Sequence, residues 1–140
     1  MRLALQTDYA LRTLMYLGSR DDRATVSEIA EFYRISAAHI AKVVHQLGRL
    51  GYVRNLRGVG GGVELGRPVA DIRVGEVILA FEGNMHLLEC VGTEGVCKIE
   101  SFCKLKSVLA RAERVQMDYL NGVTLLDVLP TRAQLRGVAQ

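Results

Sequence analysis

Three cysteines fall within a short window in the second half of the chain, at Cys90, Cys97 and Cys103. Thiolates are soft ligands that suit iron–sulfur clusters and zinc. The gaps of six and five residues differ from the short knuckle of zinc ribbons and from the common ferredoxin spacings. A loop of this width favours a bulky iron–sulfur cluster over a single ion, and three idle thiols are the less favoured alternative.

Three thiolates leave one coordination position of such a site open. No histidine lies inside the window or just after it, where Lys106 stands three residues past the last cysteine. The fourth ligand must therefore come from elsewhere. The candidates are Glu89, Glu94, Glu100, His86, solvent, or a residue from another chain.

The cysteine count and the hydropathy pattern indicate the compartment. Three cysteines cannot all pair within one chain, and the cytosol disfavours disulfides. The segment 1–8 breaks its apolar run too early for a signal peptide. No stretch approaches the roughly 18–20 apolar residues of a membrane span. We expect a cytoplasmic protein with no membrane partner.

The first third of the chain predicts three helices. Thr7 is expected to cap the first, and Thr25 opens a capping box that starts the second. A short turn at 33–35 leads to a third helix, capped by Ser36 and closed by Gly51. Two helices joined by a tight turn are typical of a helix-turn-helix.

A glycine-tipped hairpin is expected to follow these helices. Residues 52–56 and 62–65 alternate as strands do, and 57–61 form the turn. The fold class is therefore mainly α with a small β-hairpin, in the winged-helix arrangement. A phosphate-binding loop is the weaker alternative, because 58–63 lacks the last glycine of G-x-G-x-x-G and no Gly-Lys-Ser/Thr follows.

The helix that starts at Ser36 can lie in the major groove of DNA, with its first turn at the base edges. Ser36 and His39 are its polar groups, and the alanines between them permit close approach or thymine-methyl contact. Lys42 can reach phosphate, and the glycines of the hairpin bring two arginines near the backbone or minor groove. The expected DNA-binding residues are Ser36, Ala37, Ala38, His39, Lys42, Arg54, Arg57 and Gly60.

The charge distribution is consistent with a polyanion partner. Residues 1–67 hold ten Lys/Arg and six Asp/Glu, whereas 68–140 hold eight and nine. A basic half of this kind favours binding to DNA, although an ordinary solvated surface has a similar composition.

The rest of the chain predicts a helix at 74–81, a loop at 83–103, a long helix at 103–120, a turn from 124 and a loose tail after Pro130. The long helix has an apolar stripe that a small domain cannot bury alone, which predicts a homodimer; packing on its own domain is the alternative. A two-fold dimer reads a palindromic operator in double-stranded DNA. The stripe residues are Leu105, Val108, Leu109, Ala112, Val115 and Tyr119.

These elements divide the chain into four expected parts. Residues 1–67 form the winged helix-turn-helix DNA-binding domain, and 68–103 form a connecting helix and the cluster-binding loop. Residues 104–130 form the dimerisation helix and a C-terminal turn, and 131–140 form a flexible tail.

Over about residues 1–130 the chain resembles the iron–sulfur winged-helix repressor family that includes NsrR, IscR and RirA. The opening of the chain, the third helix and its end, and the glycine-rich hairpin tip carry this resemblance, together with the three cysteines and the long helix after them. The matching segments are Arg2-Leu3, Thr7–Arg12, Ser36, Ile40–Val44, Leu47, Gly51–Val53, Arg57–Gly62 and Leu65.

The resemblance implies a homodimer whose long helices cross, with each cluster near the partner's DNA-binding domain. A 4Fe-4S cluster is favoured over a 2Fe-2S cluster. In NsrR-like members an aspartate early in the first helix completes the partner's cluster, and Asp8 stands at that position; Arg12, one turn on, can support it. An acid that favours the helix dipole or pairs with Arg12 is the alternative role. The histidine of IscR-like members is missing, and RirA-like proteins remain close.

The expected function is that of a DNA-binding transcriptional repressor whose operator affinity is controlled by the cluster, with nitric oxide as the signal. No catalytic dyad is apparent, so we expect no enzyme. Three alternatives remain open. They are a regulator of iron or cluster status, a zinc-stapled DNA-binding module without sensing, and an electron-transfer protein or enzyme subunit, which leaves the recognition helix and the hairpin unexplained.

Overall fold

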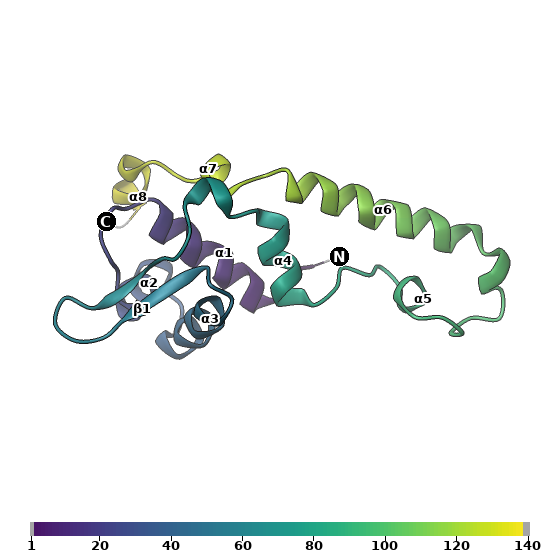
Figure 1. Ribbon diagram of the computed structural model, residues 1–140, viewed down its shortest axis with the longest axis horizontal. Coiled ribbons are helices and arrows are strands. Elements are labelled where there is room, and N and C mark those ends of the chain that lie inside the picture. Colours follow the sequence, from purple (N-terminus) through teal and green to yellow (C-terminus); the bar gives the residue numbers. More distant parts are fainter. Residues whose placement is uncertain (1, 139–140) are drawn as a thin grey trace.

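A computed structural model describes residues 2–138 and shows a mainly helical chain with one two-stranded hairpin (Figure 1). A body of short elements is followed by one long helix, α6, which extends away from it. The elements are α1 (Leu5–Gly18), α2 (Val26–Tyr33), α3 (Ala37–Arg49), β1 (Val53–Leu56), β2 (Gly62–Leu65), η1 (Val69–Asp71), α4 (Val74–Glu82), α5 (Glu89–Gly92), η2 (Glu100–Phe102), α6 (Lys104–Asn121), α7 (Leu125–Val128) and α8 (Arg132–Val138).

Local signals set the boundaries of α2 and α3, as the sequence predicts. The Thr25 hydroxyl accepts a hydrogen bond from the Glu28 amide, and the Glu28 carboxylate accepts one from the Thr25 amide. Arg34, with φ of 56°, ends α2 in the left-handed region, and Ser36 then caps α3. Gly51 has φ of +82° directly after the C-cap of α3, which is the conformation that glycine adopts most easily.

The predicted cap of the first helix is wrong. Helix α1 begins at Leu5, and its N-cap residue is Ala4. Thr7 is buried, and its hydroxyl donates to the carboxylate of Glu82 at the end of α4. The same carboxylate oxygen accepts the Ala4 amide at 2.7 Å. A carboxylate distant in sequence thus binds a free amide at the start of α1, which is the usual role of a cap.

The hairpin, called the wing below, comprises residues 53–65. Strands β1 and β2 pair antiparallel, with Val53 opposite Leu65 and Leu56 opposite Gly62. The backbone of Ala24 adds a third short pairing, since it exchanges hydrogen bonds of 2.7 and 3.0 Å with Val63. The wing is therefore attached to the loop between α1 and α2.

One hydrophobic core lies between α1, α2, α3 and the wing, and it continues past residue 67. Ile72, Val77 and Leu125 belong to it and are at most 2% exposed, so η1, α4 and α7 complete the body. Each such side chain contributes about 1.5–3 kcal/mol of burial energy. Other core members are Ala10, Leu14, Leu17, Ile29, Ile40, Val43, Val44, Leu47, Tyr52, Val53 and Val63.

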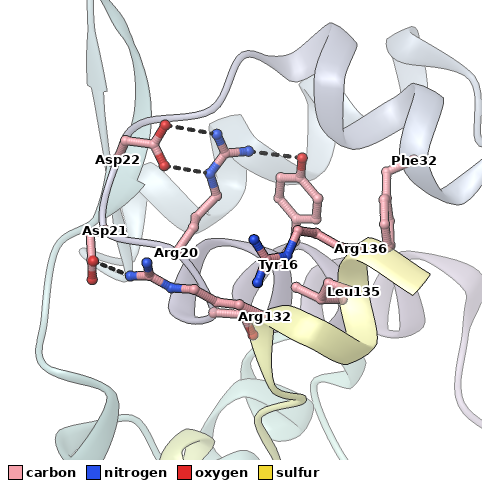
Figure 2. Close-up of a pocket in the computed structure, with 9 residues that line it drawn as sticks. Tyr16, Arg20, Asp21, Asp22, Phe32, Arg132, Leu135 and Arg136 are labelled. Carbon is pink, nitrogen blue, oxygen red and sulfur yellow. Dashed lines mark hydrogen bonds and ion pairs between the residues drawn. The ribbon is translucent and has the colours of Figure 1, made fainter. Parts of the chain in front are cut away.

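The segment after Pro130 contains a helix, α8, where the sequence predicts a loose tail. Arg132 forms an ion pair with Asp21, and Leu135 faces Tyr16 and Phe32 across a hollow of about 420 Å³ (Figure 2). The tail thus contacts residues of the body that are distant from it in the sequence. Among residues 2–138, no helix is long and apolar enough to cross a membrane.

Candidate DNA interface and cysteine loop

The predicted base-reading residues share the exposed face of α3. Ser36 and His39 are exposed, as are the two alanines between them and Lys42 one turn further on. The opposite face of α3 is buried through Ile40, Val43, Val44 and Leu47. The Ser36 hydroxyl accepts the His39 amide at 3.4 Å, so its own proton remains available to a base or phosphate.

The two arginines of the wing lie in different surroundings. Arg57 is exposed at the start of the tip, whereas Arg54 lies back on β1 and pairs with Glu64 at 3.3 Å. Gly58 and Gly60 have φ of +90° and +74°, which side-chain-bearing residues rarely adopt. A Cβ on Gly61 would lie 2.3 Å from the Leu56 oxygen, so the tight turn also requires glycine there.

Arg23 belongs to this region, although the sequence pattern indicates only that a helix ends near it. Its Nη1 donates to the Gly60 oxygen at 2.8 Å, and its Nε lies 3.2 Å from Glu64 Oε2. The contact joins positions 37 residues apart. No motif in the neighbouring sequence predicts this contact.

Asp8 and Arg12 form an ion pair on α1, with Arg12 Nε 2.8 Å from Asp8 Oδ1. The hydrogen bond to Asp8 raises the pKa of Arg12. The Arg12 and Asp8 side chains are 41% and 38% exposed, so this i,i+4 pair contributes only about 0.3–0.5 kcal/mol. The pair matches the alternative role of Asp8 and leaves its carboxylate accessible from outside.

Two aromatic contacts connect α1 to the helix-turn-helix. The Tyr33 hydroxyl donates to the Arg12 backbone oxygen at 2.9 Å, and the Arg12 guanidinium lies over the Tyr33 ring. Burial raises the pKa of Tyr33 to about 12. The rings of Tyr9 and His39 lie 6.1 Å apart, which brings the neighbour of Asp8 to the first turn of α3.

The three cysteines belong to the segment 90–103, which runs from α5 to the start of α6. Figure 1 shows this segment at the end of α6 that lies away from the wing. Cys90 is half-buried in α5, Cys97 is exposed, and Cys103 is half-buried directly before α6. Within residues 2–138, no three His, Cys, Asp or Glu side chains are gathered closely enough to hold a metal ion. The three free thiols on one loop nevertheless fit an iron–sulfur cluster by their donor chemistry.

Internal contacts engage two of the local candidates for the fourth ligand. The Glu100 carboxylate accepts the Gly95 amide at 2.6 Å and the ammonium group of Lys106, which together hold its pKa below the usual carboxyl range. His86 Nδ1 lies 2.7 Å from the buried carboxylate of Glu113 on α6. Glu89 and Glu94 are exposed.

A helix-turn-helix with a polar exposed first turn, followed by a glycine-tipped basic hairpin, defines a winged-helix DNA-binding protein. A family model described as Rrf2, iron-dependent transcriptional regulator, matches residues 3–131, and the chain belongs to this family. It is accordingly a transcriptional regulator and not an enzyme.

Relatives of nearly the same length carry the name HTH-type transcriptional regulator NsrR. The chain is 37% identical to the one from Geobacillus kaustophilus over 99% of this chain and 96% of the relative. It is also 37% identical to the one from Bacillus subtilis, over 96% and 94%. The resemblance to NsrR-like proteins is thereby confirmed.

Solved structures confirm the fold class. CymR (YrzC), the global cysteine regulator of B. subtilis, superposes with a TM-score of 0.76 at 21% identity, over 91% of this chain and 95% of that one. IscR of T. potens gives 0.72 at 24% identity, over 91% and 85%. At these identities the likeness concerns the fold alone.

Proposed function

We propose that the chain is a homodimeric repressor that binds a palindromic operator, with its affinity controlled by an iron–sulfur cluster that senses nitric oxide. The observation that carries the proposal is the set of three free thiols on one loop of a winged-helix chain. Similarity to proteins named NsrR over almost the whole length supports it.

In this proposal, Cys90, Cys97 and Cys103 hold the cluster, and Asp8 of the partner subunit supplies the fourth ligand. A 4Fe-4S cluster is favoured over a 2Fe-2S cluster. Glu100 and His86 are engaged by contacts with Gly95 of the loop and with Lys106 and Glu113 of α6, which supports a ligand from another part of the protein. The exposure of Asp8 on α1 supports its access to another chain.

The dimer of the proposal forms along α6. Leu105, Val108, Val115 and Tyr119 are between 57% and 72% exposed in the single chain, and with Ala112 they recur at steps of three and four residues. That spacing is typical of a helix that packs along a second helix. Leu109, expected on the same stripe, is half-buried and contributes less surface.

DNA binding is assigned to residues 1–67, with α3 in the major groove and the wing against the backbone. Lys42 and Arg57 neutralise phosphates, while Ser36 and His39 meet base edges. The connecting segment 68–103 carries the cluster, and 104–130 provide the dimer contact. This division is one of proposed roles and not of separately packed domains, because the hydrophobic core continues past residue 67.

When bound, the cluster supplies an iron that can react with nitric oxide. A carboxylate is a hard and weak ligand for such an iron, so Asp8 would be the most weakly held of the four ligands. Arg12 Nε lies 2.8 Å from the Asp8 carboxylate and would balance its charge when the carboxylate holds no iron. Tyr9 against His39 connects α1 to α3, and Tyr33 on Arg12 connects α1 to α2. A shift of α1 would therefore change the spacing of the two recognition helices.

A regulator of iron or cluster status is the second candidate, favoured by the description of the matching family as iron-dependent. A zinc-stapled module is the third. Anaerobic purification followed by absorption spectroscopy and metal analysis separates zinc from iron–sulfur. We expect a brown protein with visible charge-transfer bands, and colourless Cys90→Ala, Cys97→Ala and Cys103→Ala variants. A colourless, zinc-loaded parent protein contradicts the proposal.

A further inference from the structure

The wing is fastened to the rest of the molecule by an arginine from outside the hairpin. Arg23 donates from Nη1 to the Gly60 oxygen at 2.8 Å, while its Nε lies 3.2 Å from Glu64. The other carboxylate oxygen of Glu64 lies 3.3 Å from Arg54. One carboxylate, the only one in the wing, thus holds two guanidinium groups, and one of them reaches the wing tip.

The backbone beside Arg23 is fixed as well. Ala24 exchanges two hydrogen bonds with Val63 on β2. Gly62, with φ of +142°, permits this approach, because a Cβ there would lie 2.9 Å from the Ala24 oxygen. The Arg23 side chain therefore starts from a rigid position next to the strand it braces.

The tip beyond this brace has few other contacts. Nothing lies within 4 Å of where a Cβ would stand on Gly58 or Gly60, and Val59 is fully exposed. The turn has one backbone hydrogen bond, from the Gly61 amide to the Gly58 oxygen at 3.0 Å. Glycine-rich segments lose much conformational entropy when they are ordered, so a hydrogen bond that orders the tip beforehand lowers the cost of binding.

We infer that Arg23 is a positioning residue of the DNA interface, which holds the wing tip in the orientation that lets Arg57 meet the DNA backbone. The inference rests on the proposed role of the wing in DNA binding. Because Glu64 is shared by Arg23 and Arg54, the brace adds no uncompensated negative charge where phosphate approaches.

The first test compares Arg23→Gln with Arg136→Gln, which removes the same charge from α8. In Arg23→Gln we expect affinity for operator DNA to fall about fivefold to tenfold, the effect of losing one ordinary hydrogen bond of about 1 kcal/mol. In the DNA-free protein, the Gly61 amide should exchange faster with solvent. Arg23→Lys has one ammonium group that can contact Gly60 or Glu64 but not both in the geometry of a guanidinium. Its affinity and its Gly61 exchange rate should lie between those of the parent protein and Arg23→Gln. Arg136→Gln should change neither quantity.

The second test is a double-mutant cycle with Arg57→Ala. If Arg23 acts through the tip, the combined loss of affinity is smaller than the product of the two single losses. Fully multiplicative losses, or unchanged exchange at Gly61 in Arg23→Gln, overturn the inference. If Arg57→Ala alone leaves affinity unchanged, the proposed docking of the wing fails, and the exchange at Gly61 still decides whether Arg23 holds the tip.

Discussion

Truncation of Val115 tests the dimer interface quantitatively. Val115 is 61% exposed in the single chain, and Val115→Ala removes two methyl groups from each copy. Burial of each group is worth about 0.8 kcal/mol, so covering 61% of the side chain makes the loss about 1 kcal/mol per chain. A two-fold interface contains both copies. The expected total is therefore about 2 kcal/mol, or a rise of roughly 30-fold in the dimer dissociation constant.

Sedimentation equilibrium over a concentration series measures this constant directly. Val59→Ala is the matched control, because Val59 is fully exposed at the wing tip and its truncation should leave the dimer unchanged. Val115→Asp, which places a charge in the contact, should give monomers at micromolar concentration while the thermal unfolding of the body stays cooperative. A parent protein that is monomeric at that concentration, or equal dissociation constants for Val115→Ala and Val59→Ala, refutes the assignment of α6.

Arg57→Ala should weaken binding to every DNA sequence and reduce the salt slope by about one, whereas His39→Ala should change sequence preference; filter binding across salt concentrations distinguishes them, and an unchanged slope for Arg57→Ala contradicts the docking. Anaerobic Asp8→Ala should keep much of its colour but react with nitric oxide at a different rate; stopped-flow traces identical to the parent would exclude Asp8 as a ligand. Because hydrogen bonds from Lys106 and the Gly95 amide lower the pKa of Glu100, the contact between Glu100 and Gly95 should be complete above the ordinary carboxyl pKa and lost as pH falls through the lowered value. Protection of the Gly95 amide against hydrogen exchange should follow that course, and its dependence on pH should disappear in Glu100→Gln. Protection that does not vary with pH in the parent protein counts against the contact.

Features set by neighbours in the chain could be predicted from the sequence. The capping box at Thr25 and the caps at Ser36 and Gly51 each depend on residues a few positions away, so the boundaries of α2 and α3 follow from local chemistry. The alternation in 52–56 and 62–65 likewise fixes the wing, because strand pairing across a short turn is also local.

Features set by distant residues could not be predicted in this way. Thr7 has the chemistry of a cap, yet Glu82 performs that role by accepting the Ala4 amide from 78 positions away. Arg23 has no local partner that reveals its contact with the wing. Helix α8 lies against the body partly through Arg132 and Asp21, a pairing across 111 positions. The cysteine spacing indicates a cluster, but a ligand from a second chain leaves no trace in the spacing.

The central claim is that the cluster controls operator affinity, and an anaerobic binding titration tests it most directly. An operator duplex selected from a random pool is titrated with brown, cluster-loaded protein by fluorescence anisotropy, before and after nitric oxide is added. The account predicts a loss of affinity of about 10- to 100-fold after nitric oxide. It also predicts equally weak binding by the colourless Cys97→Ala variant. Affinity that is the same with and without nitric oxide, and the same in Cys97→Ala, contradicts the account.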